Sequence, residues 1–256
     1  MLSHDRSPLA LDAEFAALFD RIDFLAGLGE TVFFDIENGS TLFVDDLALD
    51  PVGASALSAN AIRAAGQHFA ALQSLLERAD PPRLPAFALL RAALDAASSA
   101  IWLLEPDDRD ERASRALRRH WADLGEAEQM SLALTASGAS SDDTAAWTRA
   151  HSRWFVGVPA DRARMALDTA QTVAAAAEVV EAFTEVPGAA VVITSGRAGF
   201  GSVAMARYAA DGELFAGSLS MALDVAETAI SLFHARAVTA SQLPDDAATL
   251  AYLRGR

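Results

Sequence analysis

Hydrophobic residues recur at helical spacing along most of the chain, and prolines, glycines and short polar segments interrupt them. The first run follows Ser7-Pro8, a favourable helix start, and ends before Gly27. Comparable runs predict helices along the rest of the sequence. The predicted helices are Pro8–Leu25, Gly53–Ala79, Pro85–Leu104, Asp107–Ala136, Asp142–Phe155, Pro159–Val186, Glu213–Ala240 and a short C-terminal one.

Two stretches depart from the helical pattern. Asn38-Gly39 separates two runs of β-branched and aromatic residues, which predicts a β-hairpin over about Thr31–Asp45. Ala189–Ser202 begins with strand composition and continues with several glycines, so it fits either a strand, a turn and the start of a helix, or an irregular segment. The predicted fold is all-α, a bundle of seven or eight helices with a small β-hairpin near the N-terminus. We expect one helical domain over residues 1–256. Ser137–Asp143 is the best candidate for a domain boundary within it.

The composition excludes several classes of chemistry. There is no cysteine, and all 20 basic residues are arginine. The chain therefore has no Walker-A lysine, Schiff-base lysine, thiol nucleophile or thiolate metal site. A net charge of −15 disfavours nucleic acid and anionic membranes at long range. The start lacks a basic segment followed by an apolar core, so we expect a cytoplasmic protein that does not bind membranes.

The predicted helix Pro85–Leu104 is apolar on nearly every side, as expected of a helix buried in a bundle. Its polar residues fall into one stripe at about 100° per residue. The stripe consists of Arg91, Asp95, Ser98, Trp102 and Glu105. One interpretation is a polar cleft lined by Arg91 and Asp95 with Trp102 as a wall, and the alternative is an exposed edge or an ion pair between helices.

The stretch LLRAALDAASSAIWLLEPDDRDERASRALRRHWADL, within residues 85–125, resembles an uncharacterised family of helical proteins from actinobacteria. That family implies a helical fold and brings no known activity. At greater distance the stretch is similar to the HEPN class of helical bundles. Some HEPN proteins are ribonucleases or toxin–antitoxin components that use an arginine and a histidine a few residues apart.

Arg115 and His120 have that spacing. Cleavage of RNA without a metal would need His120 for proton transfer and Arg115 for the phosphate. On a helix, however, the two side chains point roughly 140° apart, and Ala116 stands where the HEPN motif usually has a polar residue. The alternative is a core histidine beside a ladder of surface ion pairs.

An acidic cluster formed by Asp107, Asp108 and Glu111 resembles the aspartate-rich motif of class I terpene synthases. Carboxylates at this spacing can bind Mg²⁺ that holds a diphosphate. The cluster also lies directly after Pro106, where acidic residues favour the start of a helix without any metal. A second metal motif is absent, and no cofactor is otherwise expected.

Two weaker motifs remain. The glycine-rich segment Ser195–Ser202 could hold an anion through backbone N–H groups, although its spacing does not match a dinucleotide fingerprint. Trp147, His151 and Trp154 form a stripe at helical spacing that suits a core or a docking surface.

The leading interpretation is a helical binding or interaction module without catalytic activity, self-associating as a homodimer. Its ligand surface would be Arg91, Asp95 and Trp102, with Arg112 and Arg119 from the following helix. The occupant would be a protein partner or a small anionic ligand. The alternatives are a HEPN-like ribonuclease, the only reading that involves nucleic acid, and a Mg²⁺-dependent diphosphate enzyme.

Overall fold

The computed structural model describes residues 8–28, 34–50, 52–78, 83–136, 167–185, 189–190, 193–194 and 212–239. These residues contain helices and no strand, which confirms the all-α class for this part of the chain. The helices are α1 (Pro8–Gly27), α2 (Thr41–Leu49), α3 (Ala54–Leu76), α4 (Arg83–Leu104), α5 (Arg109–Ala136), α8 (Thr169–Thr184) and α11 (Gly212–Ala237).

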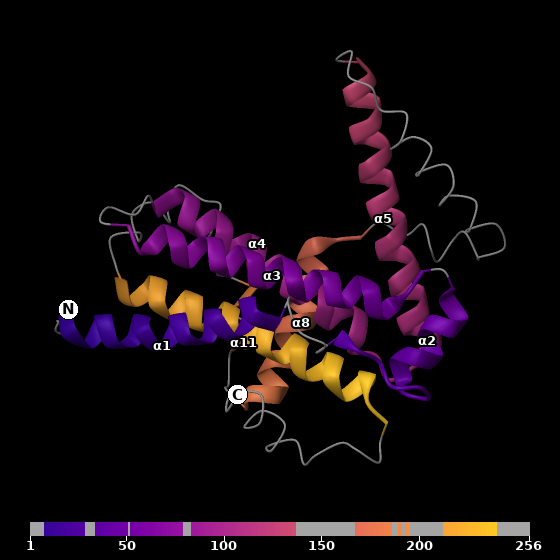
Figure 1. Cartoon of the computed structure of the whole chain (residues 1–256), viewed down its shortest axis with the longest axis horizontal. Helices are drawn as coiled ribbons and strands as arrows, with labels where there is room; N and C mark the ends of the chain where they lie inside the picture. The colour runs from indigo at the N-terminus through magenta and orange to yellow at the C-terminus, as the bar shows by residue number, and fades with distance from the viewer. Residues whose placement is uncertain are drawn as a thin grey trace.

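The helices form two layers with α5 standing apart from them (Figure 1). Helices α3 and α4 lie side by side in one layer, and α1 and α11 lie side by side in the other. Helix α8 packs against α4, and α2 lies beside the first part of α5. The far end of α5 projects away from the two layers.

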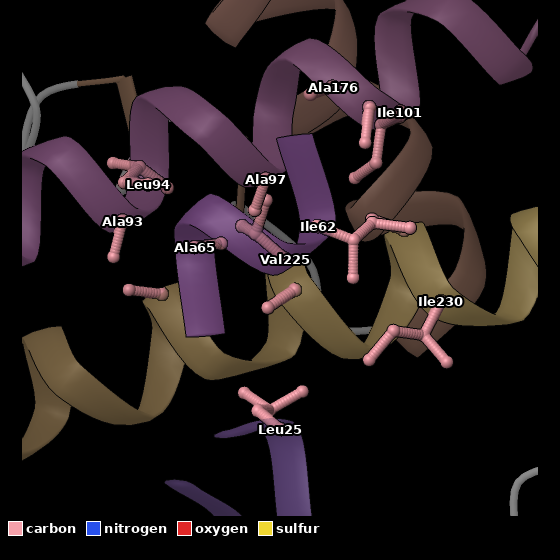
Figure 2. Packing of buried hydrophobic residues seen from close by; sticks show 14 of the residues in the cluster. Leu25, Ile62, Ala65, Ala93, Leu94, Ala97, Ile101, Ala176, Val225 and Ile230 are labelled. Atoms are coloured by element: carbon pink, nitrogen blue, oxygen red, sulfur yellow. The ribbon is translucent and has the colours of Figure 1, made fainter. Parts of the chain in front are cut away.

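Helix α4 lies inside the bundle, where it contacts α3, α5, α8 and α11. Figure 2 shows Ala93, Leu94, Ala97 and Ile101 of α4 among apolar side chains of its neighbours. The neighbouring side chains in that view include Ile62 and Ala65 of α3, Ala176 of α8, and Val225 and Ile230 of α11. By length and composition alone, Pro85–Leu104 is apolar enough to cross a membrane, but most of it is buried here, as in the core helix of a bundle.

Helices α1 and α3 approach closely at Gly66. A Cβ atom added to this glycine would lie 2.9 Å from the backbone oxygen of Leu25. Real side chains do not tolerate such a contact with a backbone atom, so glycine is what allows the two helices to cross here.

The predicted β-hairpin is not seen. Its second arm is instead helix α2, and the described part of its first arm, residues 34–37, contains no strand. Ser40 begins the helix by accepting a hydrogen bond from the Phe43 backbone N–H. The residues buried along α2 are Leu42, Asp45 and Leu49, a helical spacing that the β-branched and aromatic composition concealed.

Two other predictions need correction. Residues 189–190 and 193–194 are helical rather than extended, and the Thr194 hydroxyl donates to the Ala190 carbonyl at 2.8 Å, four residues earlier. Helix α8 begins at Thr169, with Asp168 as its N-cap, so the predicted continuous helix from Pro159 does not run through residues 167 and 168. The predicted helix Asp142–Phe155, the Ser137–Asp143 boundary and the C-terminal helix lie outside the described residues.

Candidate functional site

A pocket of about 360 Å³ opens between α3, α4, α5 and the beginning of α8. Small apolar side chains make up much of its wall, and a few polar side chains interrupt them. Its lining residues are Leu57, Asn60, Ala61, Ala64, Asp95, Ala96, Ser99, Arg119, Asp123, Leu167, Thr169 and Thr172. Mostly apolar walls with a few polar groups are typical of small-molecule sites.

Charged side chains enter the pocket from two helices. On α5, Arg119 and Asp123 form an ion pair with 2.9 Å between Nη2 and Oδ1. On α4, Asp95 lies 3.6 Å from the Arg91 guanidinium, a longer contact of similar exposure. Burial raises the pKa of the Asp123 carboxyl, although the nearby Arg119 guanidinium acts in the opposite direction. The pocket wall therefore carries two carboxylates and one guanidinium.

The hydroxyl of Ser99 is the polar group on this wall that the folded chain leaves unsatisfied. Ser99 is only 6% exposed, and its Oγ has no hydrogen-bond partner in the structure. The buried hydroxyls of Ser58 and Ser231 instead donate to the carbonyl four residues earlier, whereas the buried Ser98 hydroxyl also has no partner. A buried hydroxyl without a partner costs about 1–3 kcal/mol, and the Ser99 Oγ atom is itself closed off from the pocket space.

The beginning of α8 closes one side of the pocket. The Asp168 carboxylate accepts from the Ala170 backbone N–H at 2.8 Å, and the Asp168 carbonyl accepts from the Thr172 hydroxyl at 3.1 Å. Because Asp168 places a negative charge at this helix end, the positive end of the α8 dipole is already compensated.

Of the residues predicted to bind a ligand, only Asp95 and Arg119 line the pocket. Arg91 contacts Asp95 but is not part of the wall. Trp102 is buried beneath α5, with the guanidinium carbons of Arg115 and Arg118 lying 5.3 Å and 6.0 Å from its ring centroid. The residues of the predicted stripe therefore do not form one continuous ligand surface.

Arg112 is buried and bound to other parts of the chain. It makes two hydrogen bonds to the Asp45 carboxylate of α2, at 2.7 Å and 3.0 Å. Its Nη1 donates to the carbonyls of Pro106 and Asp107, both at 2.8 Å. These contacts join α5 to α2 and to the end of α4, and they occupy most of the donors of this guanidinium.

Arg115 of the predicted ribonuclease pair is bound to other parts of the chain. Arg115 donates to the Glu111 carboxylate at 2.9 Å, to the Glu105 carboxylate at 3.0 Å and to the Trp102 carbonyl at 2.8 Å. These contacts hold the guanidinium against the end of α4, while the half-buried His120 lies further along α5.

The three predicted metal ligands each contact a different partner within the chain. Asp107 pairs with Arg236 at 2.9 Å, Asp108 accepts from the Glu111 backbone N–H at 2.8 Å, and Glu111 pairs with Arg115. Asp108 thereby caps the start of α5, which is the helix-start alternative for this cluster. Among the described residues, no group of three His, Cys, Asp or Glu side chains could hold a metal ion.

Comparisons with protein-family models, with curated proteins and with solved structures find no match to this chain. The resemblance to the actinobacterial family and to HEPN bundles therefore stays a prediction. The glycine-rich segment Ser195–Ser202 and the Trp147, His151 and Trp154 stripe lie outside the described residues.

Sequence reasoning missed Ser99 and the α8 contribution to the pocket. Asp123 carries a weak signal, because it follows Arg119 by four residues and so faces the same side of α5. Thr169 and Thr172 carry no signal that links them to α4, since only the folded chain brings them near Asp95.

Proposed function

We propose that this protein is a binding module that holds a small molecule in the pocket between α3, α4, α5 and α8. The observation that carries the proposal is the pocket itself, whose mostly small and apolar wall also carries the charged groups of Asp95, Arg119 and Asp123.

The size of the pocket and the helices that form it support the same function. The pocket volume of about 360 Å³ lies at the low end of the range of about 300–1,000 Å³ that holds small-molecule ligands. Side chains from four packed helices form its wall, so the shape of the pocket is largely formed before a ligand binds. Self-association as a homodimer stays a separate prediction that does not depend on the pocket.

The test is ligand-observed NMR with a library of fragments that carry amine, hydroxyl or carboxylate head groups. Ala96→Leu places a larger side chain on the pocket wall, and Ala88→Leu makes the same change at an exposed position of the same helix. We expect binding of a subset of fragments to the wild-type protein and to Ala88→Leu, and loss of that binding in Ala96→Leu.

Circular dichroism confirms that both variants are folded before they are compared. If no fragment binds the wild-type protein, or if the bound fragments bind Ala96→Leu equally well, the proposed function is wrong.

A further inference from the structure

The charged side chains around the pocket are paired within the chain. On α5, Arg119 pairs with Asp123 at 2.9 Å. On α4, Arg91 pairs with Asp95 at 3.6 Å. A charged ligand would have to compete with one of these internal partners, and it would also lose hydration of its own charge on entering the pocket. The paired charges therefore favour an uncharged occupant.

The Arg119 and Asp123 pair can bind an uncharged occupant without being broken. Its contact joins Nη2 of Arg119 to Oδ1 of Asp123. A guanidinium has five N–H donors and a carboxylate has about four lone-pair sites, so one contact leaves donors on one side chain and acceptors on the other. The two side chains are 37% and 34% exposed, whereas the Ser99 Oγ atom is closed off. The pair thus presents a donor beside an acceptor on the pocket wall.

A hydroxyl is the smallest head group that matches a donor beside an acceptor. Its oxygen accepts from an N–H while its O–H donates to a carboxylate. An ammonium group only donates and a carboxylate only accepts, so each of them matches one half of the pair. The rest of the wall suits a compact apolar body, since it includes Leu57, Ala61, Ala64 and Ala96.

We propose that the pocket takes a small uncharged alcohol with an apolar body, whose hydroxyl accepts from Arg119 and donates to Asp123. This inference rests on the proposed function, because it names the ligand class of the same pocket. The ion pair stays in place and orients the hydroxyl, while burial of the apolar body against the wall supplies the hydrophobic contribution.

The experiment uses isothermal titration calorimetry of the full chain at about pH 7 with four probes that share a phenyl group. 2-Phenylethanol donates and accepts through its hydroxyl, and its isomer benzyl methyl ether only accepts. 2-Phenylethylamine is a cation and phenylacetate is an anion. We expect 2-phenylethanol to bind most tightly. The ether should bind about tenfold more weakly, because it cannot donate a hydrogen bond to the Asp123 carboxylate.

Asp123→Ala removes the acceptor of the pair. We expect the affinities for the alcohol and the ether to become equal within about twofold, because both then lack this hydrogen bond. Phenylacetate should bind more tightly to the variant than to the wild-type protein, because Arg119 has lost its internal carboxylate. Partly exposed ion pairs contribute little to stability, so the variant should fold, and circular dichroism checks that it does.

Asp110→Ala is the matched control, because it makes the same change at an exposed position of the same helix. The ratio of the alcohol and ether affinities should stay within about twofold of the wild-type value, because screening limits the effect of distant charges. Phenylacetate should gain less affinity here than in Asp123→Ala.

The outcomes separate this inference from the proposed function. If the amine or phenylacetate binds the wild-type protein as tightly as the alcohol and Ala96→Leu abolishes that binding, the alcohol inference is overturned while the pocket function stands. If the ether binds as tightly as the alcohol, or if Asp123→Ala and Asp110→Ala change the affinities equally, the hydroxyl does not donate to Asp123 and the inference is wrong. If none of the four probes binds, the inference is overturned and the fragment screen decides the function.

Discussion

At the scale of single residues, the ion pair between Arg112 and Asp45 is more deeply buried than the other ion pairs described above. Both side chains are almost wholly buried, and their bidentate contact joins helices whose residues are far apart in the sequence. The desolvation of two charges offsets much of their attraction, so the pair specifies which helices meet more than it adds stability.

Removing one partner of this pair should lower the free energy of unfolding far more than replacing both partners with apolar residues. We expect Asp45→Leu to destabilise the protein by about 3–5 kcal/mol, because it leaves a buried guanidinium without its carboxylate. Adding Arg112→Met should recover part of that loss. The free energies of unfolding in urea of the single and double variants measure the coupling.

Arg91→Ala supplies the comparison for an exposed ion pair. Arg91 contacts Asp95 but is 41% exposed, so its loss should cost less than about 1 kcal/mol.

For the buried pair, additive losses of stability for Asp45→Leu and Arg112→Met would contradict coupling between the two side chains.

At the scale of elements, the sequence predicted the long helices well and the short one poorly. Helices α1, α3, α4 and α5 begin and end within a few residues of the predicted positions, because proline, glycine and a long apolar period mark them. Helix α2 has only 9 residues, too few for a clear period. Its helical state depends on the Ser40 cap and on the Asp45 contact with α5, which no local pattern reveals.

Two glycines in helices should respond to alanine with opposite signs. Gly66→Ala should destabilise the protein by about 1–3 kcal/mol, because its Cβ would meet the backbone of α1. Gly217→Ala, within α11, has nothing within 4 Å of the added Cβ and should stabilise by about 0.5–1 kcal/mol. Urea unfolding of both variants measures this difference.

Equal stabilisation by the two alanine variants would show that α1 and α3 do not approach closely at Gly66. The change in each variant is the same single methyl group, so only its surroundings differ.

At the scale of the whole molecule, contacts between distant segments close the bundle and form the pocket. Residues 34–40 meet the end of α11, where the Glu37 carboxylate accepts from the Thr239 backbone N–H at 2.8 Å and the Glu37 N–H donates to the Ala237 carbonyl at 2.9 Å. The pocket joins residues from 57 to 172. Asp95 and Arg119 could be predicted from the sequence as ligand-binding residues. Their proximity to Ser99 and to α8 could not, because it depends on this long-range packing.

The same closure makes stability depend on pH through His234. Burial lowers the pKa of this imidazole, although the Glu37 carboxylate acts in the opposite direction. As pH falls through about 6.5, the unfolded chain therefore takes up a proton that folded His234 binds less readily. The free energy of unfolding should decrease over this range and level off below the lowered pKa.

His234→Gln should remove this part of the pH dependence. Urea unfolding from about pH 8 to about pH 5 compares the slopes of the variant and the wild-type protein. Identical slopes would show that His234 titrates alike in the folded and unfolded chains.

The alanine-rich surface of α4 also limits how the sequence can change over time. Ala93, Ala97 and Ala100 are fully buried against neighbouring helices. Alanine is the smallest residue with a side chain, so every substitution except glycine adds atoms to a filled space. Glycine in turn weakens the helix by about 1 kcal/mol. These positions have almost no neutral replacements, so the central helix should drift more slowly than the exposed helix faces around it.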